Sequence, residues 1–161
     1  MRETLYYVSW ALGSMSGPPF IASFLAIVLS LFSFSVVAQT DEVPIRSPES
    51  IEGVTKVDAE GVVNLVNKLP SLLIIDSRLT TNRSFGYIEG SIGLPDTETD
   101  CQSLGQKIND KNRPVLFYCN GPKCGRSAVA IEVAKTCGYS TLYWFRGGIE
   151  EWRNKGYPLL K

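Results

Sequence analysis

The residue in this chain best placed to do chemistry is Cys119. It follows a short apolar run, residues 115–118, and opens a loop rich in glycine and proline, residues 119–126, after which a helical pattern begins. A buried strand, a loop and a helix N-terminus together favour an anion, because backbone N–H groups point into the loop and the helix dipole adds positive charge. A thiol in this place is expected to ionise easily, and the thiolate is its reactive form. We therefore predict that Cys119 is a nucleophile; the alternative is a small residue packed at the end of a strand.

The chain contains no histidine. This absence removes Cys–His pairs, Ser–His–Asp triads and histidine metal ligands together. The cysteines are Cys101, Cys119, Cys124 and Cys137, and no two of them have the Cys-x-x-Cys spacing of a zinc site. The sequence therefore implies no metal and no organic cofactor.

The rest of the loop supplies the candidate residues for binding an anion: Asn120, Gly121, Pro122, Lys123, Cys124, Gly125 and Arg126. The glycines and proline are expected to set a loop geometry in which backbone amides face inward. Lys123 and Arg126 bring positive charge, and Arg126 is either a bidentate ligand of a sulfonate, sulfate or phosphate-like group or a solvated residue of the first helical turn.

Cys124 lies in the same loop as Cys119, with four residues between them. It is a candidate resolving cysteine that would form a disulfide with Cys119, a structural loop residue, or the working nucleophile itself. Cys101 and Cys137 are expected to be structural, and the sequence gives no reason to pair them.

The chain is long enough for one domain and an appendage, at 161 residues. Lys and Arg together number 16, as do Asp and Glu, so the net charge is zero. With no basic stripe or tail, nucleic acid is not an expected partner.

The N-terminal part differs from the rest, because residues 20–38 are apolar or small and carry no charge. We predict that residues 1–38 are either a cleaved signal peptide or a retained membrane anchor, with attachment through residues 20–38. Both readings place the remaining chain outside the cytoplasm, in a periplasmic or other extracytoplasmic compartment that permits disulfides. Residues 39–54, rich in Pro, Ser and Glu, read as a linker to a domain at residues 55–161.

Strands and helices are expected to alternate in this domain. We predict strands at residues 55–57, 72–75, 115–118 and 141–145, a short strand within 86–95, and helices at 58–68, 99–108, 127–137 and 149–153. In the first helix the expected apolar face is Val62, Val63, Leu65 and Val66. This order implies an α/β fold whose parallel sheet is covered on both faces. Asp76 and Arg78 follow a buried strand and are expected to form a supporting pair beneath the loop.

Four segments carry a resemblance to the rhodanese (sulfurtransferase) family, which extends over residues 54–160. They are the strand that ends in Asp76-Ser77-Arg78, the glycine-punctuated run 86–95, the loop from Cys119 to Arg126-Ser127, and the C-terminal run 145–158 with its Arg146-Gly147-Gly148. Tyr87 stands where the family usually has histidine. The loop also departs from the common pattern, because it has two more residues between Cys119 and Ser127 than the family's usual loop.

The resemblance implies a five-stranded parallel sheet flanked by helices and a reaction in which a sulfane sulfur passes through a cysteine persulfide. Cys119 would take sulfur from a small anion such as thiosulfate and give it to a thiol or cyanide acceptor. Three alternatives stay open: a thiol-redox protein with a Cys119–Cys124 disulfide, a phosphate or arsenate enzyme of the same fold, and a non-catalytic binding module.

Overall fold

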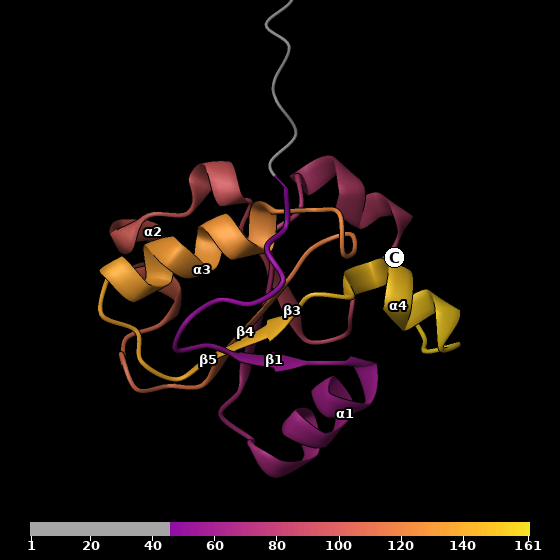
Figure 1. Ribbon diagram of the computed structural model, residues 1–161, viewed down its shortest axis with the longest axis horizontal. Helices are drawn as coiled ribbons and strands as arrows, with labels where there is room; N and C mark the ends of the chain where they lie inside the picture. The colour runs from indigo at the N-terminus through magenta and orange to yellow at the C-terminus, as the bar shows by residue number, and fades with distance from the viewer. Residues whose placement is uncertain (1–45) are drawn as a thin grey trace, which may run out of the picture. The chain divides into compact units, whose positions relative to one another are not determined.

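Five strands form one parallel sheet in the order β1-β5-β4-β2-β3. The computed structural model describes residues 46–161 (Figure 1). The strands are β1 (Thr55–Val57), β2 (Leu73–Asp76), β3 (Ser91–Gly93), β4 (Val115–Tyr118) and β5 (Leu142–Phe145). The predicted five-stranded parallel sheet is therefore confirmed, whereas the predicted export segment at residues 1–38 lies outside the described residues.

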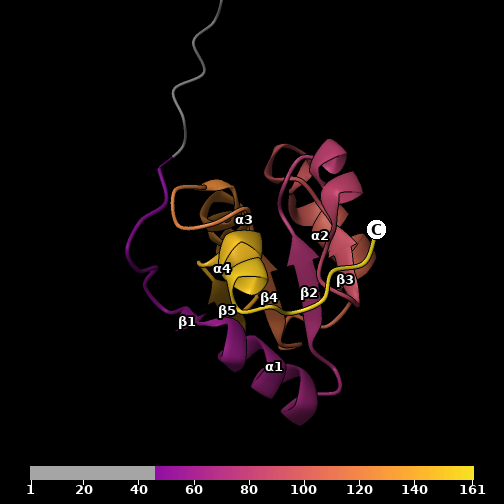
Figure 2. The ribbon, with the colours of Figure 1, turned by 90° about the vertical axis from the view of Figure 1, so that its right-hand side faces the viewer.

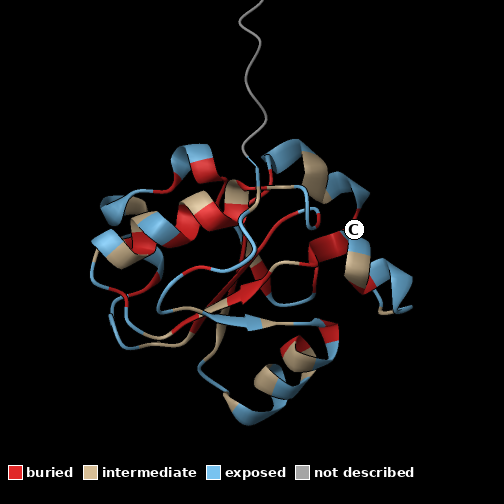
Figure 3. Ribbon diagram, viewed as in Figure 1, coloured by how far each residue is buried: buried red, intermediate tan, exposed pale blue. Residues whose placement is uncertain are grey.

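Helices cover both faces of this sheet. They are α1 (Ala59–Lys68), α2 (Cys101–Lys107), α3 (Arg126–Thr136) and α4 (Gly148–Asn154), with short 3₁₀ turns η2 (Thr80–Phe85) and η3 (Asp96–Glu98) in the connections. One hydrophobic cluster joins the sheet to α2 and α3 through Leu104 and Ile131, and another joins it to α1 and α4 through Val62 and Trp152. Figure 2 shows these layers from the side, and Figure 3 shows the buried residues along the facing sides of the sheet and helices.

The register of the central strands decides where the functional loops meet. All four residues of β4 are buried, as expected for a strand with a neighbour on each side and helices on both faces. Asp76 of β2, Tyr118 of β4 and Phe145 of β5 lie side by side as the last residues of their strands. Since the strands are parallel, the segments that follow them leave the same edge of the sheet.

Local signals in the sequence set the helix ends. The Asp58 carboxylate accepts a hydrogen bond from the N–H of Gly61 and caps α1, and Asp100 and Ser103 form a capping box at α2. Helix α3 is followed by Gly138 at a φ of 86°, a left-handed conformation that glycine adopts without strain. The prediction that Val66 belongs to the buried face of α1 is wrong, because its side chain is 49% exposed near the end of the helix.

The described end of the predicted linker packs on the domain. Ile51 is buried in the cluster that contains α3, and Arg146, just after β5, donates to the carbonyl of Pro48 and pairs with Glu49. No helix within residues 46–161 is both long and apolar enough to span a bilayer.

A disulfide joins Cys101, the first residue of α2, to Cys137 at the end of α3, with the two Cα atoms 5.3 Å apart. Cys101 is exposed and Cys137 is half-buried, so the bond fastens two neighbouring helices at the surface of the domain. The sequence predicted a structural role for both residues and left their pairing undecided.

We expect the Cys101→Ser/Cys137→Ser double variant to lose more stability than any change confined to the loop. The bond closes 36 residues, so the chain-entropy cost of losing it is about 4 kcal/mol. For the loop pair Cys119 and Cys124, five residues apart, the same cost is about 2 kcal/mol. Urea unfolding of the two double variants without reductant tests this order, and equal losses would contradict it.

Candidate functional site

Cys119 lies at the carboxyl end of β4, directly after Tyr118, and only 1% of it is exposed. A disulfide joins it to Cys124, which is half-buried, with the two Cα atoms 6.2 Å apart. The structure therefore brings together the two loop cysteines that the sequence singled out. It shows them in the oxidised state, in which the Cys119 sulfur is bonded and cannot act as a nucleophile until the disulfide is reduced.

The start of α4 fixes the first residues of the loop. The N–H of Ile149 donates to the carbonyl of Cys119 (3.1 Å), and the N–H of Glu150 donates to the carbonyl of Asn120 (2.8 Å). Gly148 has a φ of 54°, and a Cβ there would overlap the Cys119 carbonyl oxygen. The loop can approach this closely only because residue 148 has no side chain.

The second half of the loop leads into α3 and leaves donors available for an anion. The N–H of Cys124 donates to the carbonyl of Gly121 and closes a turn. Gly125 is the N-cap of α3, an eleven-residue helix, and it has no side chain that could accept a hydrogen bond. The first N–H groups of the helix are therefore not capped by a side chain. Of the predicted loop residues, Gly121 and Gly125 are buried, whereas Asn120, Pro122 and Lys123 are exposed.

Arg126, expected at the first turn of the helix, is the first residue of α3 and is already paired. Its Nη1 donates to Oδ1 of Asp96 at 2.7 Å, and the Asp96 side chain is 3% exposed. Sequence reasoning missed Asp96, which lies in η3, 30 residues away. The contact ties Arg126 to η3. Its guanidinium is therefore only partly free to bind a ligand.

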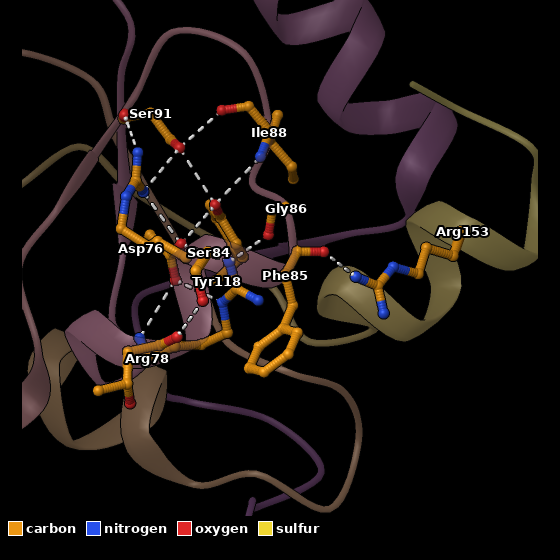
Figure 4. A network of polar contacts seen from close by, with 11 residues as sticks. Asp76, Arg78, Ser84, Phe85, Gly86, Ile88, Ser91, Tyr118 and Arg153 are labelled. Atoms are coloured by element: carbon orange, nitrogen blue, oxygen red, sulfur yellow. Dashed lines mark hydrogen bonds and ion pairs between the residues drawn. The ribbon is translucent and has the colours of Figure 1, made fainter. Parts of the chain in front are cut away.

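Asp76 is the centre of a buried ion cluster at the ends of β2 and β4 (Figure 4). Arg78 donates to both of its carboxylate oxygens, at 2.8 and 2.7 Å, in the pair that the sequence predicted. Arg83 adds a third guanidinium contact at 3.0 Å, and Arg78 also donates to the carbonyl of Gly86. A buried carboxylate needs such partners, because an unpaired one would cost several kcal/mol (about 3–5).

Tyr118 connects this cluster to the strand that carries Cys119. Its hydroxyl donates to Oδ2 of Asp76 at 2.9 Å, accepts from the N–H of Ile88, and lies 3.1 Å from Oγ of Ser91. Burial, with the nearby negative charge of Asp76, raises the pKa of Tyr118 to about 12. The sequence treated Tyr118 only as part of an apolar run, because nothing in a local pattern shows where a buried hydroxyl finds its partners.

Ser127 also has a role that sequence reasoning did not assign. Its hydroxyl accepts a hydrogen bond from Nε1 of Trp144 at 2.9 Å, and the side chain is 1% exposed. The contact ties the first turn of α3 to β5. Ser127 therefore holds the helix against the sheet.

Several open hollows border the loop. One, of about 450 Å³, lies beside Asn120 between η2 and α4, and Phe85 lines it with a side chain that is 70% exposed. Another, of about 480 Å³, lies beside Pro122 and is lined by Lys56 and Arg146. Within residues 46–161, no cluster of carboxylate, cysteine or histidine side chains is arranged to hold a metal ion.

Comparison with known proteins shows the family from the sequence and a shared fold from the structure. A model of the rhodanese-like domain family matches residues 58–155. The uncharacterized protein YibN of Escherichia coli strain K12 is 25% identical over 133 residues, covering 81% of this chain and 90% of YibN.

Among solved structures, the BH2092 protein of Bacillus halodurans is similar with a TM-score of 0.59 and 20% identity, over 66% of this chain and 76% of that one. A rhodanese-related protein of Thermoplasma volcanium has a TM-score of 0.53 and 23% identity, over 66% and 97%. A thiosulfate sulfurtransferase of Pseudomonas aeruginosa has a TM-score of 0.57 and 20% identity, over 66% of this chain but 20% of that one. These likenesses show the shared fold.

We expect Gly148→Ala to destabilise the domain and displace the loop. The left-handed backbone alone costs an alanine about 1–2 kcal/mol, and the overlap with Cys119 adds to it. Gly105→Ala is the matched control, because a Cβ at that position in α2 would meet nothing within 4 Å; the helix should gain about 0.5–1 kcal/mol. Urea unfolding measures both, and equal stability would show that the close approach at Gly148 does not hold the loop.

The raised pKa of Tyr118 predicts a loss of stability in alkaline solution. Its folded-state pKa of about 12 lies above the ordinary 10.0, so the folded protein holds this proton more tightly and stability falls as the pH rises from 10 to 12. The loss attributable to Tyr118 is up to about 3 kcal/mol. Urea unfolding at pH 9, 10 and 11 should show a shallower decline for Tyr118→Phe, and parallel declines would contradict the assignment.

Proposed function

The chain belongs to the rhodanese-like domain family, and we propose that it is a sulfurtransferase in which Cys119 carries the sulfur as a persulfide. The observation that carries this proposal is the position of Cys119. It is a buried cysteine at the end of the central strand, in a loop that runs directly into the N-terminus of α3. Backbone donors and the helix dipole favour an ionised sulfur there without a histidine base.

The reaction begins from the reduced loop. The Cys119 thiolate attacks the outer sulfur of a small anion such as thiosulfate, the sulfur–sulfur bond of the donor breaks, and sulfite leaves with the bonding pair. The product is an anionic persulfide on Cys119, which the loop amides and the first turn of α3 stabilise as they stabilise the thiolate. A thiol or cyanide then removes the outer sulfur and restores the thiolate.

The positive charge near the loop suits an anionic donor. Lys123 is exposed on the loop, and Lys56, which is also exposed, lines the hollow beside Pro122. Charges at such exposed positions attract an anion over roughly 10 Å at ordinary ionic strength. We propose that these side chains attract the anionic sulfur donor and that the backbone of the loop stabilises the persulfide.

We further propose that the domain works in an oxidising compartment outside the cytoplasm. All four cysteines are joined in two disulfides, Cys101–Cys137 and Cys119–Cys124. Disulfides persist in extracytoplasmic proteins and are rare in the cytosol. The apolar residues 20–38 fit export to such a compartment, by a cleaved signal or by a retained anchor.

A second candidate function is thiol–disulfide exchange, and the Cys119–Cys124 disulfide is the observation that favours it. A protein of this class would cycle between dithiol and disulfide without taking up sulfur. The phosphate or arsenate alternative depends on an arginine that binds the oxyanion, and it is disfavoured because Arg126 is engaged by Asp96.

We expect the reduced full-length chain carrying Cys124→Ser, in which the loop disulfide cannot form, to gain one sulfur atom from thiosulfate, and peptide mass spectrometry to place it on Cys119. Cyanide should then remove the added sulfur as thiocyanate. Cys119→Ser should abolish the gain, because a hydroxyl cannot form the persulfide. Lys135→Gln, a change at a residue of α3 that is paired with Glu132, is the control and should load normally when it is combined with Cys124→Ser.

The opposite result is also informative. If the Cys124→Ser chain gains no sulfur, while wild type interconverts fully between dithiol and disulfide, the protein would belong to the thiol-exchange class and the sulfurtransferase proposal would fail.

A further inference from the structure

We propose that Cys124 resolves the persulfide on Cys119, so that the protein releases the transferred sulfur as hydrogen sulfide and passes into the disulfide state. The net activity would be reduction of a sulfane-sulfur anion at the expense of a dithiol. This inference rests on the proposed persulfide on Cys119 and deepens it by naming the fate of the sulfur and the class of the second substrate.

The observation that carries the inference is that the loop already holds the two sulfur atoms at bonding distance. Cys119 and Cys124 are joined in a loop whose backbone is otherwise well satisfied, since the N–H of Cys124 donates to the carbonyl of Gly121 and the carbonyls of Cys119 and Asn120 accept from α4. The folded loop therefore accommodates the bond between its cysteines with its supporting hydrogen bonds in place. A thiolate on Cys124 has the Cys119 sulfur directly within reach.

The other cysteines do not compete for this role. Cys101 and Cys137 are bonded to each other and fasten α2 to α3. Within residues 46–161, this leaves Cys124 as the thiol that can meet Cys119 inside one molecule. The two disulfides therefore lie in different parts of the domain: Cys101–Cys137 joins two helices, and Cys119–Cys124 lies within the loop.

The resolving step balances without a further reactant. The Cys124 thiolate attacks the inner sulfur of the persulfide, the Sγ of Cys119, and a new bond forms between the two cysteine sulfurs. The bond between Sγ and the outer sulfur breaks, and the outer sulfur leaves with the electron pair as hydrosulfide, HS⁻, taking up the proton that the Cys124 thiol released when it became the thiolate. The outer sulfur is thereby reduced to sulfide, and the two cysteines are oxidised to the disulfide.

Return to the active form needs a dithiol reductant. Cys119 is 1% exposed and Cys124 is half-buried, so an incoming thiolate reaches the Cys124 sulfur more easily. Attack there forms a mixed disulfide on Cys124 and expels the Cys119 thiolate, the better leaving group because the loop amides and α3 stabilise it. The second thiol of the reductant then attacks its own sulfur in the mixed disulfide and releases Cys124 as a thiolate.

The first test is a single turnover of the reduced, desalted full-length chain with less than one equivalent of thiosulfate and no other reductant. Wild type should release one sulfide for each sulfite and finish with Cys119 and Cys124 linked. The rate constant for sulfide release should not depend on protein concentration, because the step is intramolecular.

The variants test which cysteine resolves the persulfide. Cys124→Ser should release sulfite but no sulfide, and should accumulate the persulfide on Cys119. Cys101→Ser/Cys137→Ser keeps the loop pair and should still release sulfide.

The outcomes separate this inference from the function on which it rests. If wild type holds a stable persulfide on Cys119 as Cys124→Ser does, Cys124 does not resolve it, and the sulfurtransferase proposal stands alone. If the extra sulfur moves onto Cys124, the residue is a relay and the inference is overturned. If neither protein takes up sulfur, the proposed function itself fails.

A second test addresses the dithiol step. Oxidised wild type treated with reduced dithiothreitol should regain both loop thiols. The Cys119→Ser variant, oxidised at Cys124 with a monothiol disulfide, should carry the mixed disulfide on Cys124 and lose it to dithiothreitol. A block on Cys119 in the converse variant, Cys124→Ser, should be removed more slowly, because that sulfur is buried. Equal rates, or faster release from Cys119, would overturn the assignment of Cys124 as the point of attack.

Discussion

The contact between the backbone of Cys119 and the start of α4 is the constraint on which the site depends. Gly148 must lack a side chain for the Cys119 carbonyl to approach, and the N–H groups of Ile149 and Glu150 then bond to the first two residues of the loop. The end of β4 and the beginning of α4 thus hold one end of the loop, and the first turn of α3 holds the other. A cysteine in a freely moving loop would gain little from helix dipoles and amides, since their effect falls off within a turn.

Buried charges near the loop serve this placement rather than the chemistry. Asp76 binds two arginines and the Tyr118 hydroxyl, and these contacts join the ends of β2 and β4 to η2. The pair between Arg126 and Asp96 does the same for α3 and η3. Charged residues near a cysteine such as Cys119 could be taken for catalytic groups. Each of the charged residues named here, however, has a protein partner at hydrogen-bond distance. The anion site that we propose is therefore built mainly from backbone, with exposed lysines at its border.

Sequence reasoning reached the sheet and the loop because their signals are local. Short apolar runs marked the strands, and Asp58 and Gly138 marked helix ends that the structure reproduces. The Cys101–Cys137 pairing was out of reach, because 36 residues separate the two and only the packing of α2 on α3 brings them together. The partners of Arg126 and Tyr118 were missed for the same reason. Val66 was misjudged because helical periodicity does not tell how far along a helix the sheet extends beneath it.

The unusual length of the loop gains a physical reason from the structure. A wider loop suits a larger anion, but here the additional residues also bring a second cysteine back to the first, with Cα atoms 6.2 Å apart across a turn closed between Gly121 and Cys124. The carbonyls at the loop's beginning remain bonded to α4 in this arrangement. A loop held at both ends and folded back in the middle satisfies its backbone while it places one thiol against the other. The extra length is therefore better explained by the geometry of a cysteine pair than by the size of a substrate.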